Sequence, residues 1–282
     1  MRLRISLRLR LILLVLLALI PALLLILNAG LDRRQMAARM VQDDALRLAR
    51  LAANNHQQLI ENTHQLLIGL SNVTALRRGD DTEGSALLAR LISTNPLYAN
   101  IGAIRPDGSV AASALPLGGN VNLADRSYFR RAIETRQFVI GEYQIGRITH
   151  KATVNFGLPL IDESGRVERV LFAALDLSWL NRLAVDAHLP PGGTLTVTDS
   201  SGTILVRYPE PDSWVGKSVP DVPLVRNAAG GEGLAQAPGV DGVIRLYAFS
   251  PLKSGMGGGV YVSIGIPADA AFAEANRTLL RD

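Results

Sequence analysis

The hydropathy of the chain is dominated by one uncharged, apolar run close to its start. Between Leu11 and Leu31 no residue is charged, and most positions are Leu, Ile, Ala or Val. About twenty such residues form a helix long enough to cross roughly 30 Å of hydrocarbon, so the run predicts a transmembrane helix over 11–31. A cleaved signal peptide is the alternative, but its apolar region normally spans only about 7 to 15 residues, and the best cleavage candidate here begins with a large residue, Leu27.

The charges around this run predict its orientation. Four arginines lie in residues 1–10, ahead of the run, and little net positive charge follows it. Cytoplasmic flanks of transmembrane helices are enriched in Lys and Arg, so we expect residues 1–10 in the cytoplasm and the chain from Asp32 onward outside it. The formal charge of +4 is no larger than these arginines supply. The remainder is close to neutral, so a nucleic-acid partner is not expected.

A second long segment, residues 32–78, has helical periodicity. It contains no proline and only one glycine, and it is rich in the helix-favouring residues Ala, Leu, Gln and Arg. Mostly apolar positions recur every three or four residues, and they are Ala45, Ala49, Ala52, Leu59, Thr63, Leu66, Leu70 and Val73. This pattern predicts one long helix rising from the membrane. Its stripe would pack either against a sheet of its own chain or against the same helix of a second copy, so a homodimer is an expected assembly.

Beyond residue 79 the pattern changes to the alternation that is typical of strands. After a short predicted helix over Ser85–Ser93, five runs separated by turn-forming residues predict strands at Tyr98–Ile104, Ser109–Ser113, Phe138–Gln144, Lys151–Leu160 and Val167–Leu177. A predicted helix over Asp125–Arg136 lies in the middle connection. We therefore expect a five-stranded antiparallel sheet in a membrane-distal module over 79–188.

The same order of elements returns in shorter form after a predicted connecting helix over Ser178–His188. The second set of strand-like runs is Thr194–Asp199, Thr203–Tyr208, Val243–Phe249 and Val260–Ile266. They predict a membrane-proximal module over 189–267. The fold class is α+β, with two tandem modules that each have an antiparallel five-stranded sheet. The second middle connection, Trp214–Pro238, lacks a basic-aromatic helix, so we expect a smaller or empty pocket there. Residues 268–282 predict a helix leading back to a second membrane span.

The predicted helix over Asp125–Arg136 carries the first polar groups of a candidate pocket. Arg126 offers a planar fork of donors that suits a carboxylate. Tyr128 on this helix and Tyr143 on the following strand add an apolar wall with a polar tip. Each residue also has a structural interpretation: Asp125 is expected to be the N-cap of its helix, and Tyr143 could pack in the core.

Polar and apolar residues alternate along the strand that begins at Lys151. One face carries Lys151 and Asn155, and the apolar face opposite should meet the long helix, which leaves the polar face for the pocket. Asp176 stands on an otherwise apolar strand, where a buried carboxylate needs partners; an ion pair with Arg126 is one structural possibility. A few convergent polar groups in an apolar cavity are typical of small-molecule sites. We therefore expect a ligand near Arg126, Tyr128, Tyr143, Lys151, Asn155 and Asp176.

Patterns typical of catalysis are missing from the sequence. There is no GxSxG, HExxH or phosphate-binding loop, no cysteine, and the four histidines lack the spacing of metal ligands. We therefore predict no catalytic residue, no metal site and no cofactor. A membrane-anchored periplasmic enzyme is the less favoured alternative to a binding module.

A long membrane-proximal helix followed by two tandem modules resembles the double Cache sensor domain of bacterial transmembrane receptors, whose modules are PAS-like. The most specific matching positions are Asp125, Arg126, Ser127, Tyr128, Phe129, Ala132, Phe138, Gly141, Tyr143, Gly146, Arg147, Lys151, Pro159, Gly165, Ala174, Leu175, Asp176 and Leu177. The resemblance implies a periplasmic ligand sensor of the inner membrane, often dimeric. Such a sensor signals through a second span to a cytoplasmic output domain, such as a diguanylate cyclase or a histidine kinase.

Members of this family that bind amino acids share a further motif. The positions that match it here are Arg126, Tyr128, Phe129, Tyr143 and Asp176. Ile145 stands where the motif has a carboxylate, so the resemblance implies a weaker grip on an ammonium group and favours a small organic anion or another carboxylate-bearing metabolite. The alternative is a dimerisation module with a vestigial pocket.

Overall fold

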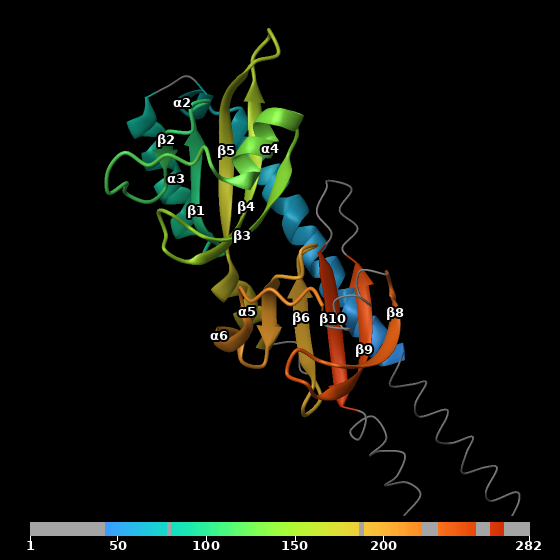
Figure 1. Cartoon of the computed structure of the whole chain (residues 1–282). Helices are drawn as coiled ribbons and strands as arrows, with labels where there is room; N and C mark the ends of the chain where they lie inside the picture. The colour runs from blue at the N-terminus through green and yellow to red at the C-terminus, as the bar shows by residue number, and fades with distance from the viewer. Residues whose placement is uncertain (1–42, 78–79, 186–188, 222–230, 252–259, 268–282) are drawn as a thin grey trace, which may run out of the picture.

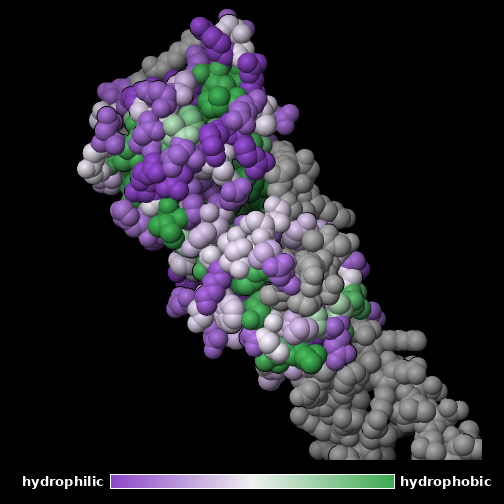
Figure 2. Space-filling model, in the orientation of Figure 1, coloured by the Kyte–Doolittle hydropathy of each residue, from purple (hydrophilic) through white to green (hydrophobic). Residues whose placement is uncertain are grey.

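The structure, a computed structural model, describes residues 43–77, 80–185, 189–221, 231–251 and 260–267. The predicted transmembrane helix over 11–31 and the predicted helix over 268–282 therefore lie outside the described residues. Among the residues that are described, no helix combines the length and apolar character needed to cross a membrane. Figure 1 shows two sheet-based modules stacked end to end along one long helix. Figure 2 shows that mostly hydrophilic residues cover the visible face of the first module, with small apolar areas between them.

The long helix covers residues 43–71 and runs behind both sheets (Figure 1). Its most buried positions are Ala45, Ala49, Ala53, Thr63, Leu67 and Leu70, which follow the predicted stripe with shifts of one residue at two places. Arg50 donates a hydrogen bond to Glu232 in the second module, and Thr63 shares one with Tyr98 in the first. The helix therefore packs on the sheets of its own chain, as one of the two predicted arrangements requires.

The long helix ends earlier than the sequence pattern predicts. It stops at residue 71, and a separate short helix, α2 (Thr74–Arg77), follows. The side chains of Ser71 and Asn72 both donate to the carbonyl oxygen of Ile68. Such local side-chain bonds compete with the helical ladder, which explains the break in a segment that is otherwise rich in helix formers.

The first module is a five-stranded antiparallel sheet of order β2-β1-β5-β4-β3. Its strands are β1 (Tyr98–Ile104), β2 (Val110–Ser113), β3 (Val139–Ile145), β4 (Ala152–Ile161) and β5 (Val167–Asp176). Each lies within one residue of its predicted bounds. Its helices are α3 (Asp81–Ser93) and α4 (Ser127–Thr135). Figure 1 shows α4 on the face of the sheet opposite to the long helix.

Alternation along the strands gives this sheet two different faces. Val154 and Phe156 belong to the apolar core shared with the long helix, which confirms the predicted apolar face of β4. Phe172 lies on the other face, in a smaller core with Tyr128 and Ala132 of α4. The polar Asn155 shares this second face, so the sheet directs its polar groups toward α4.

The second module repeats the same topology, with the order β7-β6-β10-β9-β8. Its elements are α5 (Leu177–Val185), β6 (Thr194–Thr198), β7 (Ile204–Tyr208), α6 (Pro211–Trp214), β8 (Gly233–Pro238), β9 (Ile244–Pro251) and β10 (Tyr261–Pro267). Strand β8 lies inside the predicted connection Trp214–Pro238. Its small residues and terminal proline gave no strand pattern, and an edge strand tolerates both. Two tandem α+β modules with five-stranded sheets are confirmed.

Candidate ligand-binding site

Helix α4 begins two residues later than predicted, and this changes the role of Asp125. Arg126 takes the N-cap position with an extended backbone and makes no side-chain cap bond, and the helix starts at Ser127. Asp125 is therefore not the N-cap. Its two carboxylate oxygens accept hydrogen bonds from Arg147, at 3.0 and 2.9 Å. These hydrogen bonds hold the pKa of Asp125 below its usual range.

Arg126 reaches over the end of β3. Its Nη1 donates to Gln144 Oε1 at 3.3 Å, and its Nη2 donates to the carbonyl oxygen of Ile145 at 3.4 Å. Its Nε is buried and has no hydrogen-bond partner. Both bonds are long and none goes to Asp176, so the structural ion pair between Arg126 and Asp176 is not formed.

Asp176 is buried at the end of β5 and instead pairs with Lys151. The Lys151 Nζ lies 2.9 Å from Oδ2 of Asp176, while the backbone N–H and the hydroxyl of Ser178 donate to Oδ1 at 2.9 and 2.6 Å. Burial alone would raise the pKa of Asp176, but the hydrogen bonds from Ser178 and Lys151 outweigh it, so this pKa lies below its ordinary value. Asp176 is thus an ionised carboxylate that ties the end of β5 to the start of α5.

Tyr128 and Asn155 meet between α4 and the sheet. The two side chains are almost fully buried, yet the Tyr128 hydroxyl and Asn155 Oδ1 have no hydrogen-bond partner. Burial raises the pKa of Tyr128 above its ordinary value, and the neighbouring Asn155 side chain opposes this rise only in part, so this hydroxyl stays protonated. Helix and sheet approach closely because Gly141 has no side chain: a Cβ there would lie 2.9 Å from Tyr128 Cβ.

Tyr128 and Asn155 line a small cavity under α4, which we call the α4 cavity. Its other lining residues are Asn100, Leu123, Gln144, Gly146, Arg147, Ile148, Thr149, Phe172 and Ala174. Its volume is about 20 Å³, little more than one water molecule requires. The turn between β3 and β4 contributes Gly146, Ile148 and Thr149, so this turn closes the cavity.

Tyr143 does not join this cavity. Strand β3 carries a bulge, since Ile140 pairs with Phe156 whereas Tyr143 pairs with Val154. The extra residue reverses the alternation, so Tyr143 shares the face of Phe156 rather than that of Asn155. Its ring lies against Gly216 of the second module. Ile145 follows on the same face and is half exposed, so the position where the family motif has a carboxylate faces away from the α4 cavity.

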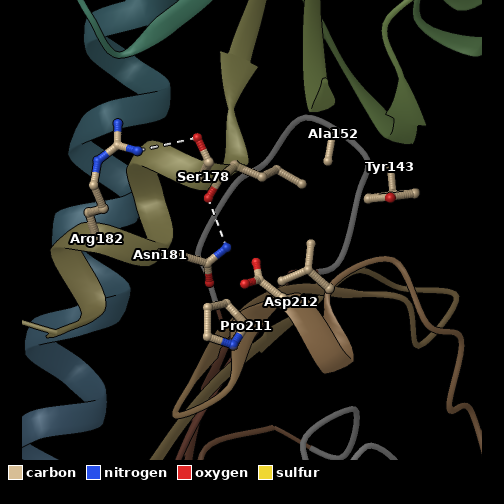
Figure 3. Close-up of a pocket in the computed structure, with 9 residues that line it drawn as sticks. Tyr143, Ala152, Ser178, Asn181, Arg182, Pro211 and Asp212 are labelled. Atoms are coloured by element: carbon tan, nitrogen blue, oxygen red, sulfur yellow. Dashed lines mark hydrogen bonds between the residues drawn. The ribbon is translucent and has the colours of Figure 1, made fainter. Parts of the chain in front are cut away.

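A second, larger cavity lies at the junction of the two modules, and we call it the junction cavity. It measures about 480 Å³ and is lined by Tyr143, Ala152, Leu177, Ser178, Asn181, Arg182, Pro211, Asp212 and Val215. Figure 3 shows these side chains converging from β3 and β4, from α5 and from α6. Of the predicted site residues, Tyr128 and Asn155 line the α4 cavity, and Arg126 is bonded to Gln144 of its lining. Lys151 and Asp176 pair at the end of the sheet, and Tyr143 belongs to the junction.

Sequence reasoning missed a buried cluster in the second module. Arg207 and Arg245 both donate to the carboxylate of Asp241, at 3.1 and 2.7 Å, and Arg207 also donates to Thr196. This cluster fills the face of the second sheet that corresponds to the α4 face of the first. The signal was present in the sequence: Arg207 is a charged residue in the apolar run ILVRY, just as Asp176 is in its own strand. Within the described ranges, no group of three His, Cys, Asp or Glu residues could hold a metal ion.

Comparison with known proteins supports the class that this fold defines. A family model described as a Cache domain, in its double form, matches residues 33–275. The chain belongs to this family and is a double Cache sensor domain of the kind found in signalling kinases and chemoreceptors.

Individual relatives agree with this assignment. Sporulation kinase D of Bacillus subtilis (strain 168) is 28% identical over 169 residues, which cover 60% of this chain and 33% of the kinase. The chain thus matches about a third of the length of that curated relative. The extracellular domain of the proposed histidine kinase rpHK1S-Z16 has a TM-score of 0.73 at 16% identity, with 82% of this chain and 96% of that one covered. The ligand-binding domain of the amino acid chemoreceptor PctB of Pseudomonas aeruginosa PAO1, in complex with L-Arg, has a TM-score of 0.66 at 22% identity, with 83% and 97% covered. These two structures share the fold.

Proposed function

We propose that this chain is the periplasmic sensor region of a transmembrane receptor and that its first, membrane-distal module binds a small carboxylate-bearing metabolite, either an organic acid or an amino acid. The topology of this proposal assigns residues 1–10 to the cytoplasm and 11–31 to the membrane, and the long helix over 43–71 belongs to the signalling segment that follows the span. The output domain, a kinase or a cyclase for example, would follow residues 268–282 and a second span.

The observation that supports a binding site is the convergence of unpartnered polar atoms under α4. Buried polar atoms in folded proteins almost always have partners, so exceptions indicate bound water, an ion or a ligand. Here Arg126 Nε, the Tyr128 hydroxyl and Asn155 Oδ1 are all buried without a partner. Tyr128 and Asn155 line the α4 cavity, and Arg126 is bonded to Gln144, which also lines it.

The chemistry of these three atoms supports the ligand class. Arg126 and Tyr128 can both donate hydrogen bonds to a carboxylate, and donation from a guanidinium is charge-assisted and therefore strong. Asn155 Oδ1 is an acceptor that suits a hydroxyl or an ammonium group on the same ligand. The long bonds from Arg126 to Gln144 and Ile145 are weak enough to be exchanged for shorter bonds to a ligand.

The size of the α4 cavity implies that binding is coupled to movement. A ligand larger than a water molecule fits only if the turn over residues 146–150 moves outward. A ligand that binds the open arrangement more tightly shifts the receptor toward it. Lys151 directly follows this turn and pairs with Asp176, which holds Ser178 at the start of α5. Movement of the turn would therefore be transmitted to the connection between the modules.

Binding to the α4 cavity can be tested on the full chain purified in detergent. Calorimetric titration with a panel of organic acids and amino acids is expected to yield a carboxylate that binds. Replacing Arg126 with Ala should weaken that binding at least tenfold, because the carboxylate loses its charged donor. Arg130→Ala is the matched control, since Arg130 is exposed on the same helix, and it should bind like the unchanged protein.

Two results would count against this function. If no carboxylate in the panel binds, the alternative of a dimerisation module with a vestigial pocket is favoured. If a ligand binds but Arg126→Ala leaves its affinity unchanged, Arg126 is not part of the site.

A further inference from the structure

The junction cavity is not used by the proposed function. Its volume of about 480 Å³ falls in the range of about 300–1,000 Å³ that is typical of small-molecule sites. It also lies on the other side of the first sheet from the α4 cavity, because the bulge in β3 turns Tyr143 away from Asn155. A ligand in the junction cavity would therefore contact none of the residues of the α4 cavity.

Most polar groups of the junction cavity are already engaged with the protein. Asn181 donates to the carbonyl oxygen of Leu177 and accepts from the backbone N–H of Arg207, at 2.9 Å each. Ser178 donates to Asp176. Arg182 Nη1 lies 3.4 Å from Ser178 Oγ, and Figure 3 shows its guanidinium extending along α5, on the side away from Asp212.

Asp212 is not engaged in this way. It is exposed, its carboxylate receives no hydrogen bond and no ion pair from any part of the chain that the structure describes, and Figure 3 shows it between Asn181 and Tyr143, where the modules meet. Around it lie the apolar side chains of Ala152, Leu177, Pro211 and Val215 and the aromatic ring of Tyr143. An unpaired carboxylate beside an aromatic ring and an apolar wall attracts a cation that carries an alkyl group.

We propose that the junction cavity is a second ligand site and that it binds a small organic ammonium compound. The ammonium group pairs with Asp212, and the alkyl part packs against Val215, Ala152 and the ring of Tyr143. An anion of the same shape is disfavoured next to Asp212, because Arg182, the other charged group of the lining, lies on the side away from that carboxylate.

Such a ligand would contact both modules at once. Tyr143 and Ala152 belong to the first module, and Asp212 and Val215 belong to the second. Binding therefore stabilises the arrangement in which the modules are close together, by the free energy of that contact. The site would modulate the response of the receptor independently of the α4 cavity.

The two tryptophans of the chain give a direct readout of this site. Trp179 lies on α5 and Trp214 on α6, the two helices that border the cavity. The full chain in detergent is titrated with n-butylammonium chloride while tryptophan fluorescence is recorded, and n-butyrate at matched ionic strength serves as the anionic probe. We expect a saturable change in tryptophan fluorescence with n-butylammonium. Binding of n-butyrate to the junction cavity, and a fluorescence change from it, are not expected.

Variants identify the carboxylate. Asp212→Asn should weaken n-butylammonium binding at least tenfold, and Tyr143→Leu should weaken it several-fold. Asp221→Asn, at an exposed position of the same connection, should bind it like the unchanged protein.

The proposal is overturned if n-butylammonium gives no saturable signal, if Asp212→Asn binds it equally well, or if binding is lost equally in Asp221→Asn. Any of these results leaves the carboxylate proposal intact, because that test depends on Arg126 and on a different ligand.

Discussion

At the scale of the residue, the fold places His56 in surroundings that disfavour its charged form. It lies on the long helix, and its Nε2 is fully covered and has no hydrogen-bond partner, although part of the residue remains exposed. It lines an apolar space with Ile140 and Leu175 of the first module and Val197 and Leu205 of the second. Burial lowers the pKa of His56 from its ordinary value, and the hydrogen bond with the Ala52 carbonyl oxygen only partly opposes this.

His56 should therefore make folding sensitive to mild acid. The unfolded chain takes up a proton near the ordinary pKa of about 6.5, whereas the folded chain takes it up only at a lower pH. Stability is thus lost as pH falls through about 6.5. We predict that His56→Leu reduces the decrease in melting temperature between about pH 7 and pH 5 and makes the protein more stable at the lower pH.

Thermal melts followed by circular dichroism at several pH values measure this effect. His150→Asn is the control, because His150 is exposed and its positive φ of 53° suits asparagine. Equal slopes for the unchanged protein and His56→Leu would show that His56 does not contribute.

At the scale of the element, α5 is the connection through which the modules act on each other. Its first turn is fixed by Asp176 of the first sheet, through the bonds from Ser178. Four residues after Leu177, Asn181 accepts from the backbone N–H of Arg207 on β7. Arg207 in turn donates to Asp241 in the turn between β8 and β9. A continuous set of hydrogen bonds therefore runs from the end of β5 to the far side of the second sheet.

We predict that Asn181→Ala weakens this connection. The buried N–H of Arg207 would lose its acceptor, which costs about 1–3 kcal/mol of unfolding free energy. Urea unfolding measures the loss, and hydrogen exchange should become faster at the amide of Arg207. Arg182→Ala, which changes an exposed residue of the same helix, should change the unfolding free energy by less than about 0.5 kcal/mol. A loss no larger for Asn181→Ala than for this control would contradict the role of α5.

At the scale of the whole molecule, the long helix joins both sheets and would carry any movement of the modules toward the proposed membrane span. Its Arg50 bonds to the second module and its Thr63 to the first. The two proposed ligand sites, the α4 cavity and the junction cavity, thus lie on modules that both bond to one helix. This arrangement suits the proposed receptor, whose output domain would lie on the other side of the membrane.

The proposed orientation in the membrane can be tested because the chain has no cysteine. We predict that Glu163→Cys, in the exposed turn between β4 and β5, reacts with a membrane-impermeant maleimide on intact spheroplasts. Ser6→Cys, ahead of the apolar run, should react only after lysis, because the arginines around it favour the cytoplasm. Labelling of Ser6→Cys on intact spheroplasts would contradict the proposed topology and indicate the opposite orientation.

The sequence by itself determined most of the architecture. Strand alternation and turn residues placed the five strands of the first sheet within one residue, and the repeat of that pattern predicted a second module. These features are local, so the sequence shows them directly. Strand β8 was missed because its residues, GLAQAP, carry no local strand signal, and only its pairing with β9 makes it a strand.

The composition of the sites was decided by the tertiary structure alone. One extra residue in β3 turned the side chains of Tyr143 and Ile145 away from the α4 cavity, and alternation in the sequence cannot reveal a bulge. Asp125 pairs with Arg147, and Asp176 pairs with Lys151, because folding brings these segments together. The junction cavity has no sequence signature, because it forms only where two modules and their connecting helix come together. The sequence determined what each element is, and packing between distant elements decided which side chains share a site.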